Sequence, residues 1–186
     1  MKNIKLAALM ILAVAVFAGC GAKRAEVSTI TVSSKGDIVL EEIADETSCD
    51  TEGLKGYLDE AMDETEGVSL KTCEVKDGKA YIKSTYTSYK PYTEFTGYKF
   101  FNGTVLDAKV AGFVFDAPVY AVQNGAVSAE AAADAPAESD TCVVSTQDYA
   151  VKVPGTITYV SDVNATVDGD TVTPSGTESE IIIIYK

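Results

Sequence analysis

Runs of alternating apolar and polar residues, separated by four glycine-containing turns, predict a hairpin-rich β protein. The turns are Ser34-Lys35-Gly36-Asp37, Lys76-Asp77-Gly78-Lys79, Gln123-Asn124-Gly125-Ala126 and Val167-Asp168-Gly169-Asp170. Asn-Gly and Asp-Gly accept the positive φ angles that two-residue hairpin turns require. Strand-like runs flank these turns at 29–33 and 38–43, 68–75 and 80–87, 119–122 and a short run after Gly125, and 163–167 and 171–173. We therefore expect a mostly antiparallel sheet.

The last third of the chain adds two strands and a linker to this pattern. Residues 151–160 predict a longer strand that is interrupted at Pro154-Gly155. Ile181–Ile184 is a run of consecutive isoleucines that would promote aggregation at an exposed edge, so we expect a strand buried on both faces inside the sheet. Residues 126–140 are small and acidic and contain Pro136, which predicts a loose loop between a front part, 28–125, and a back part, 141–186.

One amphipathic helix is predicted between a cap at Asp50 or Thr51 and a stop at Gly67. Its opposite face is acidic and is expected to be solvated. A second, shorter helix is expected over 104–111. The fold class is α+β, with a hairpin-rich, mostly antiparallel sheet and one clear amphipathic helix packed on it. The apolar stripe of that helix has helical spacing and consists of Leu54, Tyr57, Leu58, Ala61 and Met62.

The first twenty residues are typical of an export signal. Lys2 and Lys5 precede the uncharged stretch 6–18, which spans roughly 20 Å as a helix and is too short for the ~30 Å hydrocarbon core of a membrane. The junction Phe17-Ala18-Gly19-Cys20 resembles the lipobox of bacterial lipoproteins, although Phe17 stands where leucine is usual. This resemblance implies a signal peptide over 1–19, a lipid on Cys20, a tether over 20–27 and an extracytoplasmic domain over 28–186. The alternative is an ordinary signal peptide that precedes an incidental cysteine.

The composition excludes several classes of function. The chain has 28 acidic and 15 basic residues and no histidine, with a formal net charge of −13. This charge repels nucleic acid, and the lack of histidine removes Ser-His-Asp, Cys-His and HExxH chemistry. Asp162–Asp170 places oxygen atoms at alternate positions but lacks the glycine and glutamate of a calcium-binding EF-hand loop. We predict no catalytic residue, no metal site and no cofactor.

Three cysteines follow Cys20, namely Cys49, Cys73 and Cys142. A helix that starts after Cys49 and a strand that returns from Gly67 would bring Cys73 back near the start of the helix. Cys49 and Cys73 are therefore the best candidates for a disulfide, at a loop length that contributes on the order of 3 kcal/mol. The alternative is that Cys73 is a reduced core residue beside Leu70 and Val75.

Several segments of the chain form a recognisable set, including TEGLKGYL at 51–58, SLKTCEV at 69–75, FFNGTV at 100–105 and the end of the chain from Ile157. With these segments, most of residues 38–186 resembles a group of uncharacterised lipoproteins of clostridial-type gut Firmicutes. The resemblance implies a Gram-positive cell envelope and supplies no activity.

Together these observations predict a non-enzymatic binding or scaffolding module that meets the membrane through the lipid on Cys20. Its ligand would be cationic or a carbohydrate. The alternatives are a small-solute receptor for a transporter and a histidine-free, carboxylate-based hydrolase of the cell wall. The aromatic residues that recur every third position could stack on sugar rings, but core packing is the better interpretation; they are Tyr86, Tyr89, Tyr92, Phe95, Tyr98 and Phe101.

Overall fold

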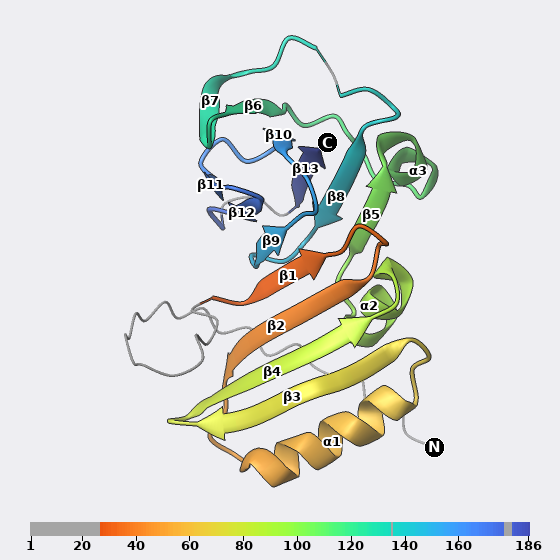
Figure 1. The fold of residues 1–186 in the computed structure, drawn as a ribbon, viewed down its shortest axis with the longest axis vertical. Coiled ribbons are helices and arrows are strands. Elements are labelled where there is room, and N and C mark those ends of the chain that lie inside the picture. The colour runs from red at the N-terminus through yellow and green to blue at the C-terminus, as the bar shows by residue number, and fades with distance from the viewer. Residues whose placement is uncertain (1–26, 135, 177–179) are drawn as a thin grey trace.

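The computed structural model describes residues 27–134, 136–176 and 180–186. Its strands form two sheets, and the chain is β-rich with three helices in the described residues, which confirms the expected α+β class (Figure 1). All pairings among the described strands are antiparallel except β1 with β9. The predicted signal peptide at 1–19, Cys20 and the tether up to residue 26 lie outside the described residues.

The first sheet has seven strands and contains the long hairpins of the front part. In spatial order they are β11 (Thr166–Asp168), β12 (Thr171–Thr173), β9 (Ala150–Lys152), β1 (Thr29–Val32), β2 (Ile38–Asp45), β4 (Lys79–Tyr86) and β3 (Val68–Lys76). Asp77 and Asn124 have φ angles of 54° and 52°, and the φ angles of the glycines that follow them are also positive. The Asp77-Gly78 and Asn124-Gly125 turns thus adopt the backbone that the sequence predicts, whereas at Asp168-Gly169 only the glycine has a positive φ angle. All four expected hairpins form.

The second sheet has six strands and draws on the remaining chain. In order they are β5 (Phe100–Thr104), β8 (Thr141–Ser145), β13 (Ile181–Tyr185), β10 (Ile157–Val160), β6 (Tyr120–Gln123) and β7 (Ala126–Ala131). Each sheet combines strands from both sides of 126–140, so the proposed parts 28–125 and 141–186 do not correspond to the two sheets. The first six residues of the expected loose loop form β7 instead.

The stretch 151–160 contains two strands in different sheets rather than one interrupted strand. β9 belongs to the first sheet and β10 to the second, and the chain crosses between them at Pro154-Gly155. A Cβ atom on Gly155 would lie 2.5 Å from the carbonyl oxygen of Lys186, so only glycine fits this close approach. Thr156 then pairs with Lys186 through two backbone hydrogen bonds of 2.7 and 3.0 Å.

Two apolar cores hold the sheets together. The larger lies between the sheets and combines Ile30 and Val151 of the first with Val160 and Ile183 of the second. The smaller lies on the other face of the second sheet, where Ile182 and Ile184 pack with residues around α3. The isoleucine run is therefore buried on both faces in a central strand, as the sequence predicts.

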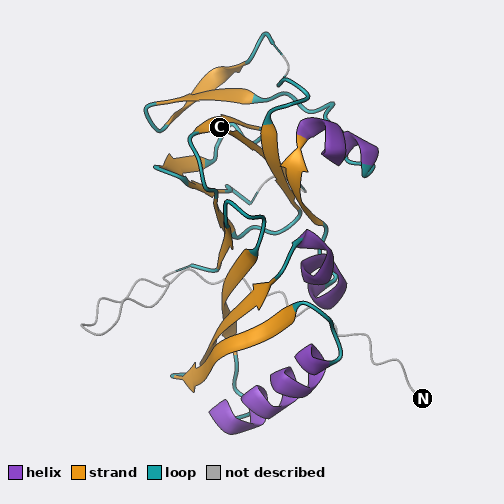
Figure 2. Ribbon diagram, turned by 45° about the vertical axis from the view of Figure 1, so that its right-hand side comes forward, coloured by secondary structure: helices purple, strands orange, loops and turns teal. Residues whose placement is uncertain are grey.

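The three helices line one side of the molecule (Figure 2). They are α1 (Thr51–Asp63), α2 (Tyr89–Thr96) and α3 (Val105–Val110). The carboxylate of Asp50 accepts a 2.9 Å hydrogen bond from the amide of Gly53, which confirms the predicted cap of α1. Leu58 and Met62 are buried, but Tyr57 is 50% exposed, because α1 packs mainly on the edge strand β3 and buries a narrower stripe than expected.

Candidate functional site

A hollow of about 440 Å³ lies between α2, the start of β5 and the segment that follows α3. We call it the α2–α3 groove. Most of its lining is apolar, with charged side chains at the rim. The lining residues are Tyr89, Lys90, Thr93, Glu94, Lys99, Phe100, Ala111 and Phe113.

Local sequence signals determine the two helices, α2 and α3, that border this groove. α2 begins after Ser88, tolerates Pro91 in its first turn and ends at Gly97, whose φ of 75° suits a glycine cap. α3 begins at Thr104, whose side chain accepts a 3.1 Å hydrogen bond from the amide of Asp107. The amide of Phe113 then bonds to the carbonyl of Ala108, which turns the chain back toward α2.

Phe101 supports the floor from below. Its ring centroid lies 4.9 Å from that of Tyr89 and 5.5 Å from that of Phe113. Phe101 itself is buried, and a Cβ on Gly103 would come within 2.8 Å of its ring, so a larger residue at position 103 would displace it. The aromatic floor of the α2–α3 groove is thus fixed by packing before any ligand arrives.

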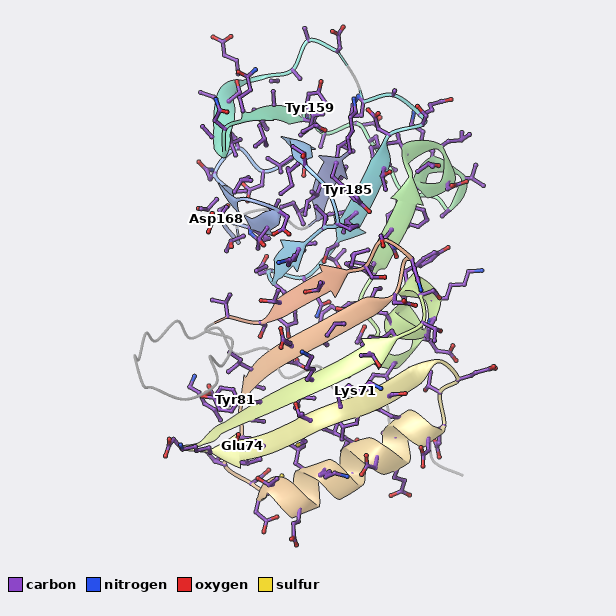
Figure 3. All side chains as sticks on the ribbon, in the orientation of Figure 1. Lys71, Glu74, Tyr81, Tyr159, Asp168 and Tyr185 are labelled. Atoms are coloured by element: carbon purple, nitrogen blue, oxygen red, sulfur yellow. The ribbon has the colours of Figure 1, made fainter. Side chains whose placement is uncertain are left out.

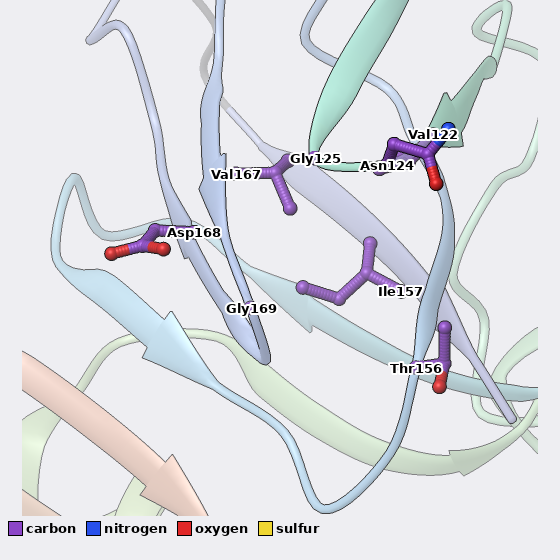
Figure 4. A pocket seen from close by; sticks show the side chains of 8 residues that line it. All are labelled: Val122, Asn124, Gly125, Thr156, Ile157, Val167, Asp168 and Gly169. Atoms are coloured by element: carbon purple, nitrogen blue, oxygen red, sulfur yellow. The ribbon is translucent and has the colours of Figure 1, made fainter.

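A second hollow, of about 470 Å³, lies between the tips of the β6–β7 and β11–β12 hairpins. Figure 4 shows Val167 and Ile157 pointing toward each other across it, while the carboxylate of Asp168 points away. Asn124 and Thr156 provide exposed polar groups at the rim. The hollow can accept a small apolar group, but among the described residues that line it no aromatic side chain is present and the one carboxylate points away.

Comparison with known proteins gives no matching family model, no similar curated protein and no similar solved structure. Among the residues that the structure describes, no helix is long and apolar enough to cross a membrane. The functional interpretation therefore rests on the site chemistry.

Cys49 lies just before α1 and Cys73 lies in β3, and Thr51 links these two elements. The hydroxyl of Thr51 accepts a 2.8 Å hydrogen bond from the amide of Val75, which fastens the start of α1 to the end of β3. Both thiols are free and partly buried. Burial raises the pKa of both, and the charge of Cys49 further raises the pKa of Cys73. Cys142 is fully buried in the second sheet, and burial raises its pKa to about 12.

A Cys49–Cys73 disulfide remains a prediction. We expect protein purified from an oxidising envelope to carry it, and its loss in Cys73→Ser to lower the free energy of unfolding by about 3 kcal/mol if the bond is unstrained. Non-reducing peptide mapping is the direct measurement. Recovery of Cys73 as a free thiol would instead support the reduced core residue.

Asp162 in the calcium-like stretch has a structural role. It is 1% exposed, and its two carboxylate oxygens accept hydrogen bonds from the amides of Asn164 (2.9 Å) and Ser175 (2.7 Å). These bonds hold two loops together. In the described part of the chain, no group of three or more acidic or cysteine residues is arranged to hold a metal ion. The acidic residues along α1 are mostly exposed, as expected for a solvated face.

A hydroxyl network lies beside the groove residues, on the helix-facing side of the first sheet. Tyr92 donates to Gln147, Ser84 donates to Tyr86 over 3.0 Å, and Tyr149 donates to Glu42 over 2.9 Å. Tyr86 and Tyr92 are almost fully buried, and their rings meet edge to face at 4.9 Å. Burial, with a smaller contribution from the charge of Glu42, raises the pKa of Tyr86 to about 12 and that of Tyr92 well above its usual value.

This network predicts alkaline unfolding. A tyrosine whose pKa is higher in the folded than in the unfolded state stabilises the fold below pH ~10 and loses that contribution as the pH rises toward the folded value. For Tyr86 the loss between pH 10 and 12 is on the order of 2–3 kcal/mol. Urea unfolding at pH 9, 10 and 11 should show this decline, and Tyr86→Phe should flatten it. Tyr57→Phe, on a half-exposed ring, serves as the control; equal slopes in both variants would contradict the prediction.

Sequence reasoning did not find the α2–α3 groove. Core packing explains Tyr86, Tyr92 and Phe101 of the aromatic series, all of which are buried. Tyr89 instead lines the groove. The available signal was the Ser88–Gly97 segment with Pro91 near its start, which marks a short helix and thereby places Tyr89 and Lys90 in the first turn.

Proposed function

We propose that the chain is an extracytoplasmic lipoprotein anchored through Cys20 and that its domain is a non-enzymatic binding module with its ligand site in the α2–α3 groove. The observation that carries this proposal is the preformed aromatic floor of a surface groove of about 440 Å³. Binding sites for small molecules are commonly concave, mostly apolar and of this size.

The two alternative functions fit the structure less well. A retaining or inverting glycosidase needs two carboxyl groups about 5–9.5 Å apart, whereas each of the two hollows is lined by one carboxylate, Glu94 or Asp168. A solute receptor that closes two lobes needs its site between them. The α2–α3 groove lies instead on one side of a body whose two sheets share a core.

Filling the groove tests the binding role. Ala111 is exposed at the end of α3 and lines the groove, so Ala111→Phe should block the site without disturbing the core. A thermal-shift panel of sugars, short peptides and amphipathic acids should contain compounds that raise the midpoint by several degrees in the unaltered protein and not in this variant. Ala133→Phe, at an exposed loop position, controls for added surface area. Equal shifts in all three proteins would place the ligand elsewhere.

The anchor has its own test. Cys20→Ala should remain unlipidated, and fractionation of the native host should find it released from the membrane or retained as the uncleaved precursor. A variant that is processed to the usual size and stays membrane-bound would exclude Cys20 as the anchor.

A further inference from the structure

The lining of the α2–α3 groove has more basic than acidic residues, whereas the chain as a whole is acidic. Acidic residues outnumber basic ones by 28 to 15 in the chain, and six lysines of the described residues form ion pairs with carboxylates. Lys90 and Lys99 are exposed and have no carboxylate partner within 4 Å in the described part of the chain. Glu94 is the remaining charged residue among the described residues that line the groove, so the lining carries a formal net charge of +1.

The apolar surface continues beyond the floor of the groove. Val110 and Val114, which flank the lining residues Ala111 and Phe113 in the chain, are 81% and 61% exposed. Leu106, one helical turn before Val110, is 46% exposed. Half of the large exposed hydrophobic residues of the described chain therefore belong to α3 and the segment that follows it. Exposed apolar surface of this kind marks interaction sites.

The groove offers little to a sugar ring, which presents many hydroxyl groups. The hydroxyl of Thr93 already donates to the carbonyl oxygen of Phe100 over 3.3 Å. The other neutral side chains of the lining are one tyrosine, two phenylalanines and one alanine. The polar groups that remain for a ligand are the Tyr89 hydroxyl, the Glu94 carboxylate and the ammonium groups of Lys90 and Lys99. The two ammonium groups favour an anionic ligand over a neutral sugar.

Addition of a peptide strand is also disfavoured here. β5 is an edge strand of the second sheet, but α2 and α3 both contact it. At the groove, the carbonyl of Phe100 accepts a hydrogen bond from the hydroxyl of Thr93. This backbone acceptor is therefore not free for an added strand.

We propose that the α2–α3 groove binds a small amphipathic organic anion. Its apolar body lies on Tyr89 and Phe113, and the positive charges of Lys90 and Lys99 attract its carboxylate, sulfonate or phosphate. This attraction gives the anion its preference, and the fixed aromatic floor reduces the ordering cost of binding. This inference rests on the proposed binding function and adds the chemical class of the ligand.

The test compares two probes that share one ring system. Naphthalene-2-sulfonate is an amphipathic anion, and naphthalene-2-sulfonamide is its neutral counterpart. Isothermal titration calorimetry of the mature lipidated protein in a non-ionic detergent, with a detergent blank, gives both affinities. We expect the sulfonate to bind at least tenfold more tightly than the sulfonamide.

Three variants separate the contribution of the lysine charges to probe binding from that of the groove itself. Lys90→Gln/Lys99→Gln should reduce the preference for the sulfonate to within twofold. Lys71→Gln/Lys76→Gln makes the same change in net charge at two exposed lysines of β3 that have no carboxylate partner within 4 Å among the described residues, and should leave the preference unchanged. Figure 3 shows Lys71 on this strand, away from α3. Ala111→Phe should weaken both probes at least tenfold.

The outcomes distinguish a failure of the anion preference from a failure of the proposed binding function. Equal affinity for both probes, with both lost in Ala111→Phe, would overturn the anion preference and leave the binding site in place. Binding that Ala111→Phe does not change would overturn both. Absence of sulfonate binding at millimolar concentration would overturn the ligand class, and the thermal-shift panel would then decide whether the groove binds anything else.

Discussion

Replacing Ile183 with alanine is expected to lower the free energy of unfolding by about 3–5 kcal/mol. Ile183 is fully buried in β13, and its cross-strand neighbours Val143 and Val160 are fully buried too. All three belong to the core between the sheets, so the cavity left by truncation would have little room to collapse.

The measurement is thermal or urea unfolding of both proteins. For a chain of this size, the expected loss corresponds to a drop of roughly 6–15 °C in the thermal midpoint. Val163→Ala, at a position that is 37% exposed, should change the free energy by less than about 0.5 kcal/mol. A midpoint for Ile183→Ala within 2 °C of the unaltered protein would show that β13 does not lie between two packed faces.

Asp162→Ala is expected to cost about 2–4 kcal/mol, for a different reason. The substitution removes both acceptors of the Asn164 and Ser175 amides and leaves these donors without their partner. Hydrogen bonds to an ionised carboxylate are about twice as strong as neutral ones. Asp162→Asn keeps one carbonyl oxygen and should recover part of the loss.

Urea unfolding gives the free energy of each variant, and limited proteolysis shows whether the joined loops open locally. Asp168→Ala provides the matched control, since Asp168 lies at an exposed hairpin turn. If Asp162→Ala and Asp168→Ala were equally stable, the carboxylate of Asp162 would not hold the loops together.

Some elements follow from the sequence because their causes are local. The Asp77-Gly78 and Asn124-Gly125 turns set positive φ angles within two residues. The start of α1 needs only Asp50 and the amide of Gly53. The isoleucine run of β13 is too apolar to lie at an edge, which predicts burial without naming its neighbours.

Other features depend on residues far apart in the chain. Residues 151–160 read as one strand, yet contact with Lys186 at Gly155 divides them between two sheets. β7 extends the short run predicted after Gly125, because β6 lies beside it. β8, which is not among the predicted strands, lies between β5 and β13. Tyr57 matches the helical period but is half exposed, because α1 covers an edge strand rather than a full face.

By itself, the sequence determined the α+β class, the hairpins and the helix that follows Asp50, since period and turn chemistry act over a few residues. The candidate site was decided by the tertiary structure alone. Lys90 and Lys99 stand at opposite ends of α2 and its following loop, and Phe113 belongs to another segment. Packing of Phe101 against both Tyr89 and Phe113 brings these parts together, and no local pattern encodes that contact.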